Sequence, residues 1–301
     1  MVFSAVLLAA ALTPDSVCLS NRHGHAEIAL HGAFVMHYVP AGGSEVVAEP
    51  KPFFGQADKA LLVGGIPLCW PWFVNQGPKG APPNGLTRYQ IWRVKGRENA
   101  DERSVLDLEV DDDEWTRSAW NHGYHAEMRF VLDERLSIRF AVTNTGTDAM
   151  KCNDGFHSYF RVGDAHRCTV EGTDGLPYFN RGEADLGFTR RWRGDFRVGE
   201  MRYGYVFLSG PHEFRLVDPV MGRTLIVSYS GVDKSCIWNP GTQNAMFAES
   251  WRGFVCVEGA NLYDSGVYEL APGARHEVSM TVGVKRVHVA DARGISGRLP
   301  K

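Results

Sequence analysis

The sequence predicts an all-β protein that folds as one continuous sandwich. Apolar and polar residues alternate strictly in segments from one end of the chain to the other, which is typical of half-buried strands. The 33 Gly and 15 Pro are spread along the chain, as in proteins whose many short strands are joined by tight turns. Helical periodicity is nearly absent, apart from the first dozen residues and a turn near residues 244–248.

Strands are predicted wherever the alternation is regular. In residues 104–112, for example, Leu106, Leu108 and Val110 point to one face, while Asp107 and Glu109 point to the other. The segments with this pattern are HAEIALHG (25–32), SVLDLEVDD (104–112), YHAEMRFVL (124–132), RLSIRFAVT (135–143), EFRLVD (213–218), RTLIVSYS (223–230), GFVCVEG (253–259) and HEVSMTVGV (276–284). Each segment therefore has one face for a core and one for solvent.

The 301 residues are enough for two ordinary domains or for one large all-β domain. No composition shift, repeat or low-complexity linker divides the chain, so we expect a single sandwich over residues 20–286. Residues 1–19 are an apolar segment, either a short helix or a weak signal-like stretch, and residues 287–301 are a tail. The acidic run 111–114 and the basic stretch 190–197 are expected in solvated loops.

Charge and cysteine content indicate which kinds of ligand and which cellular compartment to expect. The 32 basic and 35 acidic residues are well mixed, so the sequence has no footprint for nucleic acid or a membrane surface, and we expect a monomer with a small ligand. The six cysteines show neither C-x-x-C nor zinc-ligand spacing, which favours free thiols in a reducing, cytoplasmic setting. Export is the alternative, but no Lys or Arg precedes Arg22, and the apolar stretch is too short to span a bilayer.

Common catalytic signatures are missing, which excludes several classes of enzyme. The chain has no phosphate-binding loop, no strand-linked G-x-G-x-x-G, no H-E-x-x-H and no G-x-S-x-G. What remains is a set of polar residues in segments rich in aromatic residues and glycine, the composition of a sugar pocket. The segments are GGIPLCWPWF (64–73), PNGLTRYQIW (83–92), NDGFHSYFRVGD (153–164), CIWNPG (236–241) and FVCVEGAN (254–261).

Two titratable residues in these segments are candidates for acid–base chemistry. His157 by itself is compatible with a hydrogen-bonded core histidine, and Glu258 with the outward residue of a strand. Strand periodicity, however, puts Glu258 on the same face as Phe254 and Cys256. A carboxylate in such surroundings has a raised pKa, as a general base working near neutrality requires.

Taken together, the five segments resemble the hexose-6-phosphate mutarotases, a branch of the aldose 1-epimerase superfamily, over about residues 20 to 285. GGIPLCWPWF is similar to the family's R-G-G-[IV]-P-[VL]-C-W-P-W-F, and FHSYFRVGD to its L-H-[TS]-Y-F-x-V-G-D. VDPVMGR, WNPG and FVCVE follow in the family's order. The resemblance implies a galactose mutarotase-like β-supersandwich, an isomerase, and no metal or organic cofactor.

The resemblance also implies the catalytic roles. Glu258 is the expected general base, which takes the proton of the anomeric hydroxyl, and His157 is the expected general acid, which protonates the ring oxygen. The ring opens to an aldehyde, rotation about C1–C2 presents the other carbonyl face, and reclosure gives the other anomer. Trp70, Asn84 and Arg88 are the candidate substrate-binding residues, and the substrate is a hexose or a hexose 6-phosphate.

The chain departs from the family pattern at three positions. Val63 replaces an Arg that helps to hold the substrate phosphate, Asn84 replaces a His, and Gly204 aligns with an Asp that binds sugar hydroxyls. Lys59, Lys79 and Arg93 are nearby in sequence and are candidates to supply the missing charge. The alternative function is therefore a non-catalytic carbohydrate-binding or sugar-sensing protein on the same fold.

Overall fold

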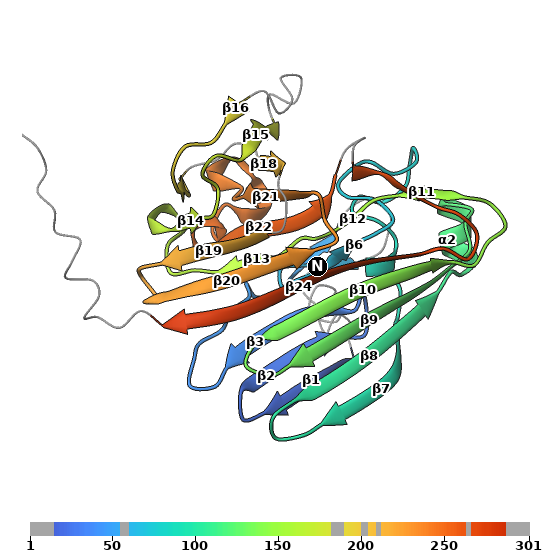
Figure 1. The fold of residues 1–301 in the computed structure, drawn as a ribbon, viewed down its shortest axis with the longest axis horizontal. Helices are drawn as coiled ribbons and strands as arrows, with labels where there is room; N and C mark the ends of the chain where they lie inside the picture. Colours follow the sequence, from blue (N-terminus) through green and yellow to red (C-terminus); the bar gives the residue numbers. More distant parts are fainter. Residues whose placement is uncertain are drawn as a thin grey trace, which may run out of the picture.

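The computed structural model describes residues 15–54, 60–181, 190–199, 204–208, 212–262 and 266–286. These residues form antiparallel sheets that pack into a β-sandwich (Figure 1), which confirms the predicted all-β class. Each of the eight segments with regular alternation corresponds to a strand. The alternation was informative because each of these strands has one face in the core.

Two large sheets dominate the described part of the chain. One runs in the order β17 (Phe196–Arg197), β14 (Thr169–Glu171), β19 (His212–Asp218), β20 (Arg223–Ser230), β24 (Arg275–Arg286), β10 (Leu136–Asn144), β9 (Tyr124–Leu132), β8 (Ser104–Asp111) and β7 (Arg93–Asn99). The other runs β16 (Arg190–Arg191), β15 (Pro177–Asn180), β18 (Tyr205–Leu208), β21 (Lys234–Trp238), β22 (Phe254–Asn261), β12 (Asp154–Phe156) and β6 (Leu68–Cys69), and β13 (Tyr159–Arg161) also pairs with β22.

Smaller sheets and short helices complete the described fold. The strands are β1 (Ser16–Asn21), β2 (Gly24–Ala29), β3 (Phe34–Pro40), β4 (Lys51–Phe54), β5 (Ala60–Val63), β11 (Met150–Cys152) and β23 (Tyr268–Leu270). The helices are α2 (Glu114–Ala119) and the 3-10 turns η1 (Thr87–Tyr89), η2 (Ala165–Arg167), η4 (Gly241–Gln243), η5 (Ala245–Phe247) and η6 (Trp251–Gly253). The turn expected near residues 244–248 is η5, which follows η4.

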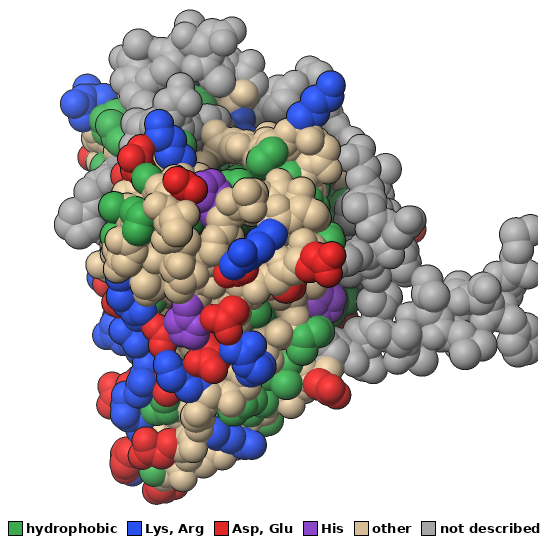
Figure 2. Space-filling view, turned by 90° about the vertical axis from the view of Figure 1, so that its right-hand side faces the viewer, with side chains coloured by type: hydrophobic (Ala, Val, Ile, Leu, Met, Phe, Trp, Pro, Cys, Tyr) green, Lys and Arg blue, Asp and Glu red, His purple; other side chains and the backbone are tan. Residues whose placement is uncertain are grey.

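The core lies between the inner faces of the two large sheets. Phe130 and Phe140 of the first sheet belong to the same buried cluster as Phe156 and Val257 of the second. Fully burying such a side chain stabilises a fold by roughly 1.5–3 kcal/mol. The outer face of the first sheet carries ion pairs between its strands instead, such as Lys95–Glu127 and Arg139–Glu277. On the side of the molecule shown in Figure 2, both signs of charge are interspersed among small groups of hydrophobic side chains. This division follows from the period-two pattern of the strands.

The helix α2 corrects the prediction that the acidic run 111–114 is a solvated loop. Asp113 caps the helix, because its carboxylate accepts a hydrogen bond from the backbone N–H of Thr116 at 2.7 Å. The Thr116 hydroxyl is in turn the acceptor for the N–H of Asp113 at 2.9 Å, so the two residues form a capping box. A helix of six residues is too short to produce a detectable helical period.

The ends of the chain lie largely outside the described residues. The predictions for a short N-terminal helix or signal-like stretch and for a tail at 287–301 fall there, except that β1 already begins at Ser16, inside the segment 1–19. No described helix is both long and apolar enough to cross a membrane. All six cysteines have free thiols, and only Cys18 is exposed.

Candidate active site

The pairing of β22 with two short strands brings the predicted acid and base together. Phe156, at the end of β12, pairs with Gly259. Tyr159, at the start of β13, pairs with Cys256. His157 lies between these two points and therefore opposite Glu258, and its backbone N–H donates to the carbonyl of Pro67 at 3.0 Å. The main chain thus fixes which residues face each other.

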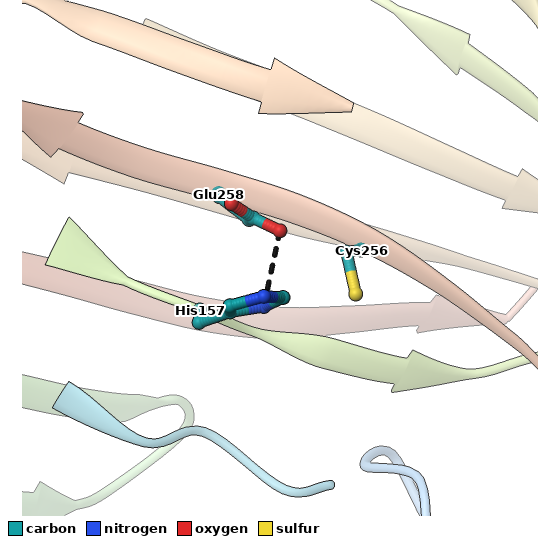
Figure 3. Close-up of side chains that lie close together, drawn as sticks. All are labelled: His157, Cys256 and Glu258. Carbon is teal, nitrogen blue, oxygen red and sulfur yellow. Dashed lines mark ion pairs between the residues drawn. The ribbon is translucent and has the colours of Figure 1, made fainter. Parts of the chain in front are cut away.

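The two side chains are in direct contact (Figure 3). His157 Nδ1 lies 3.0 Å from Glu258 Oε1, and their side chains are 13% and 3% exposed. The imidazole is stacked on Tyr159, with ring centroids 4.5 Å apart, and on Phe73, with centroids 5.7 Å apart. Its Nε2 is 3.3 Å from the Tyr159 hydroxyl. The ring is consequently held between two stacked aromatic neighbours and contacts the Tyr159 hydroxyl at Nε2.

Burial shifts both groups away from their ionised forms. It raises the pKa of Glu258 to about 8, against a smaller lowering by Arg181. Burial, together with smaller contributions from the positive charges of Arg88 and Arg181, lowers the pKa of His157 to about 3. At neutral pH the pair therefore holds one proton, which resides on Glu258.

The predicted faces of β22 are confirmed. Phe254 and Cys256 belong to a small cluster with Tyr159, whereas Val255 and Val257 belong to the main core. Both faces are buried, which a surface strand does not show. Glu258 shares the first face and is surrounded by aromatic rings and thiols, as its raised pKa requires.

Arg88 lies close enough to act electrostatically on His157 and on Tyr159. It is 6% exposed, and one guanidinium nitrogen donates to the Leu62 carbonyl at 3.3 Å. Its Nε is buried and has no hydrogen-bond partner. A buried guanidinium N–H without a partner is costly in a folded protein, so it is a donor available to a ligand.

The other two predicted substrate-binding residues, Trp70 and Asn84, make contacts within the fold. Trp70 is completely buried in the core, where its ring packs on Tyr124 and its indole N–H donates to Tyr268 at 3.1 Å. Asn84 adopts a left-handed backbone, with φ of 63°, and its side-chain oxygen accepts from the N–H of Val74 at 2.7 Å. In this structure Trp70 therefore belongs to the core, and Asn84 holds its own loop.

Val63, which stands where the family pattern has an arginine, lines a pocket with a volume of about 320 Å³. Tyr159, Phe247 and Phe254 line it beside Val63, and the pocket therefore adjoins the aromatic wall that supports His157. Its polar lining includes the cations Lys51 and Arg161 and the carboxylate Glu49. Spacing in the sequence offered no signal for this pocket, because it is assembled from four separate segments.

The surroundings of Gly204 reveal a cation that the sequence analysis missed. A Cβ at Gly204 would lie only 2.9 Å from the Cys236 sulfur and 3.4 Å from Cδ of Arg181. The backbone N–H of Arg181 donates to the Gly204 carbonyl at 2.9 Å. Because β15 pairs with β18, Arg181 reaches the neighbourhood of both catalytic candidates, whose pKa values it lowers.

Arg93 and Lys79, two of the three cations considered as replacements, do not line the pocket at Val63. Arg93 is an exposed residue of β7 that pairs with Asp111 at 2.6 Å, so its charge is already engaged. Lys79 is exposed on a loop, and Lys59 lies outside the described residues.

The antiparallel sandwich is similar to the folds of solved structures described as mutarotases or mutarotase-like proteins. Superposition on the crystal structure of a "putative mutarotase (YeaD)" from Salmonella typhimurium gives a TM-score of 0.78, with 24% identity and 90% of each chain covered. A galactose mutarotase-like protein from Lactobacillus casei gives a TM-score of 0.68 at 18% identity, over 90% of this chain and all of that one. These likenesses establish a galactose mutarotase-like fold.

Sequence comparison identifies the family. Residues 15–283 match the aldose 1-epimerase family, to which this chain belongs. A protein from Cenchrus ciliaris named "Putative glucose-6-phosphate 1-epimerase" is 27% identical over 79% of this chain and 75% of that protein. A protein of the same name from Salmonella typhimurium is 27% identical over 81% and 82%. The chain is therefore an isomerase of the epimerase type that acts on a small-molecule sugar.

Proposed function

We propose that this protein interconverts the α and β anomers of a hexose, with Glu258 as general base and His157 as general acid. The observation that carries this proposal is the separation of 3.0 Å between His157 Nδ1 and Glu258 Oε1. The anomeric hydroxyl and the ring oxygen of a hemiacetal are bonded to the same carbon. Two groups that lie this close together can reach both oxygens at once.

The reaction needs a proton on His157 and a carboxylate at Glu258. The resting pair has its one proton on Glu258, and transfer across the 3.0 Å contact produces the reactive form without a change in net charge. A hydrogen bond donated by the anomeric hydroxyl stabilises the carboxylate form. Glu258 then removes the hydroxyl proton while His157 protonates the ring oxygen, and the bond between C1 and the ring oxygen breaks.

Reclosure reverses the two transfers and regenerates the pair. Rotation about C1–C2 turns the aldehyde, and the C5 hydroxyl attacks its other face. His157 takes the proton of that hydroxyl, and Glu258 returns its proton to the carbonyl oxygen. The stacked rings of Phe73 and Tyr159 support this sequence by holding the imidazole in one orientation. Each group is thus ready for the next cycle.

The site supports a hexose as substrate more strongly than a hexose 6-phosphate. Curated relatives carry a glucose-6-phosphate name, but in this chain Val63 replaces the arginine that the family resemblance assigns to the phosphate. Arg88 and Arg181 are close to the catalytic pair and suit sugar hydroxyls. Lys51 and Arg161 are the cations of the pocket beside Val63.

The setting of the protein is also a proposal. We propose a monomer in the cytoplasm, which the six free thiols support because a reducing compartment preserves them.

The decisive experiment follows the equilibration of pure α-anomers of glucose, galactose and glucose 6-phosphate by polarimetry or NMR. Wild type should accelerate at least one of them, and His157→Ala and Glu258→Gln should each lower the rate by roughly 10²–10⁴-fold. Glu277→Gln, an exposed carboxylate of β24, is the matched control and should behave as wild type. If wild type binds a sugar but leaves every spontaneous rate unchanged, the protein is the sugar-binding alternative.

A further inference from the structure

Three side chains with different donor atoms converge at the catalytic pair (Figure 3). The ligand atoms of His157, Cys256 and Glu258 all lie within 4.8 Å of one another. Cys256 and Glu258 are two positions apart on the same face of β22, and His157 faces them from the short segment between β12 and β13. The mechanism proposed above uses the histidine and the glutamate but gives the thiol no task.

The donor set is one that zinc binds. Thiolate sulfur, imidazole nitrogen and carboxylate oxygen are its usual ligands, at about 2.3, 2.0 and 2.0–2.2 Å. A tetrahedral ion with these bonds separates its ligand atoms by about 3.3–3.6 Å. The 3.0 Å between the nitrogen and the oxygen needs a small expansion, and the sulfur, which lies within 4.8 Å of both atoms, needs at most a modest approach.

A second observation points to a ligand at the same place. His157 Nδ1 is buried and has no hydrogen-bond partner, although it lies close to the Glu258 carboxyl. A nitrogen lone pair in this position lacks a well-directed donor, which is costly in a buried site. A cation between the three side chains provides a partner for that lone pair.

Charge balance favours a divalent ion in this buried site. A thiolate and a carboxylate together carry two negative charges, which one divalent cation neutralises, and binding releases the two protons that Cys256 and Glu258 otherwise hold. Cys256 and Glu258 are 0% and 2% exposed, so an uncompensated charge would be strongly disfavoured. Three protein ligands leave the fourth tetrahedral position for water or a sugar hydroxyl.

We propose that His157, Cys256 and Glu258 form an inhibitory site for Zn²⁺ or a similar borderline-soft divalent cation. The bound ion occupies the nitrogen and the carboxylate that transfer protons during anomer interconversion, and it therefore switches that reaction off. Binding itself is independent of the proposed function, and only the inhibition depends on it. Cys256 is the residue that makes this site different from an ordinary acid–base pair.

The binding test uses Co²⁺ as a spectroscopic substitute for Zn²⁺ in the intact protein. Exposed Cys18 is first changed to Ser, so that an adventitious surface thiol does not contribute. Titration with Co²⁺ should then produce a thiolate-to-cobalt charge-transfer band that Zn²⁺ abolishes by competition. Cys256→Ser should remove the band, whereas Cys168→Ser, a buried thiol of another region, should leave it unchanged. Loss of a residue that only hydrogen-bonds a metal ligand weakens metal affinity by roughly 10–100-fold. His157→Ala removes a ligand itself and should weaken the affinity for Co²⁺ by more than this.

The inhibition test separates this proposal from the proposed function. Zn²⁺ should slow anomer equilibration by wild type, EDTA should restore the rate, and Cys256→Ser should keep its activity in the presence of Zn²⁺. Absence of the band, or an equal band in Cys256→Ser, overturns the metal site. If that variant fails to fold, Cys256→Ala replaces it. A band that depends on Cys256 in a protein without epimerase activity supports the site and refutes the function.

Discussion

The Tyr159 ring lies parallel to the His157 imidazole, at an interplanar angle of 6°, and its hydroxyl is 3.3 Å from His157 Nε2. Tyr159 also closes one side of the pocket at Val63. A single residue thus supports the ring of the proposed acid, contacts its second nitrogen and separates it from the neighbouring pocket. Substitutions can distinguish the first two of these contributions, which are stacking and hydrogen bonding.

Tyr159→Phe should lower kcat/KM for the preferred sugar by about two- to tenfold. The change keeps the stacked ring and removes only the hydroxyl contact, and one net hydrogen bond contributes about 0.5–1.5 kcal/mol. Tyr159→Leu, which removes the stacking as well, should cost more. Steady-state rates by polarimetry give the comparison. A Phe variant as damaged as the Leu variant would contradict the division of roles.

The rate should be level across neutral pH and fall above about pH 8. The active pair holds one proton, and the pKa of Glu258, raised to about 8 by burial, marks its loss. The lower limit lies near the pKa of His157, which burial depresses to about 3. Rates measured from pH 5 to 9.5 after subtraction of the spontaneous reaction test this profile. Activity that rises through pH 9 would show that the pair does not work with a single proton.

Glu258→Gln should become more stable than wild type as the pH rises. The folded pKa of Glu258 is about 8 against an ordinary 4.5, so between these values the native state binds more protons than the unfolded state. Wild-type stability therefore falls with increasing pH in this window. His157 acts with the opposite sign, but only between about 3 and 6.5, so the window from pH 6.5 to 8 reports on Glu258.

Melting temperatures of the two proteins, measured between pH 5 and 9, report this effect. Their difference should grow with pH up to about 8 and then become constant. A difference that stays the same across the whole range would mean that Glu258 titrates normally in the folded protein.

Val63→Arg should raise the preference for glucose 6-phosphate over glucose by about 10–100-fold. The residue lines the pocket that contains Lys51 and Arg161, and a charge-assisted hydrogen bond contributes about 1.5–3 kcal/mol. Val63→Met fills a similar volume without charge and should leave the ratio of kcat/KM values unchanged. Equal ratios in the two variants would show that this pocket does not receive the phosphate end.

Trp70→Phe should destabilise the fold by about 1–3 kcal/mol and change KM by less than about twofold. The ring is buried in the core, and its N–H donates to Tyr268, so the substitution loses a hydrogen bond and leaves unfilled volume. Chemical denaturation and sugar titrations measure the two effects separately. A large rise in KM at unchanged stability would contradict this prediction and show that Trp70 contributes to sugar binding.

The sequence predicted much of the fold because the signals involved are local. A strand with one buried face shows its period in any short window, as residues 124–132 do, and the faces of β22 follow from the same period. The short helix α2 was missed because its capping box, between Asp113 and Thr116, is a side-chain interaction in a segment without helical period. Apart from η5, the short 3-10 turns were not predicted either, because three residues show no helical period.

The candidate site likewise has features that local sequence predicted and features that depend on the tertiary structure. His157 and Glu258 could be named from motifs and from the face of one strand, and the chemistry of the pair follows from the two residue types. Only the tertiary structure decided that they are in contact, that Trp70 belongs to the core, that Asn84 holds its loop, and that Arg181 reaches the pair. These outcomes depend on the register between strands from distant parts of the chain, and no local periodicity encodes that register.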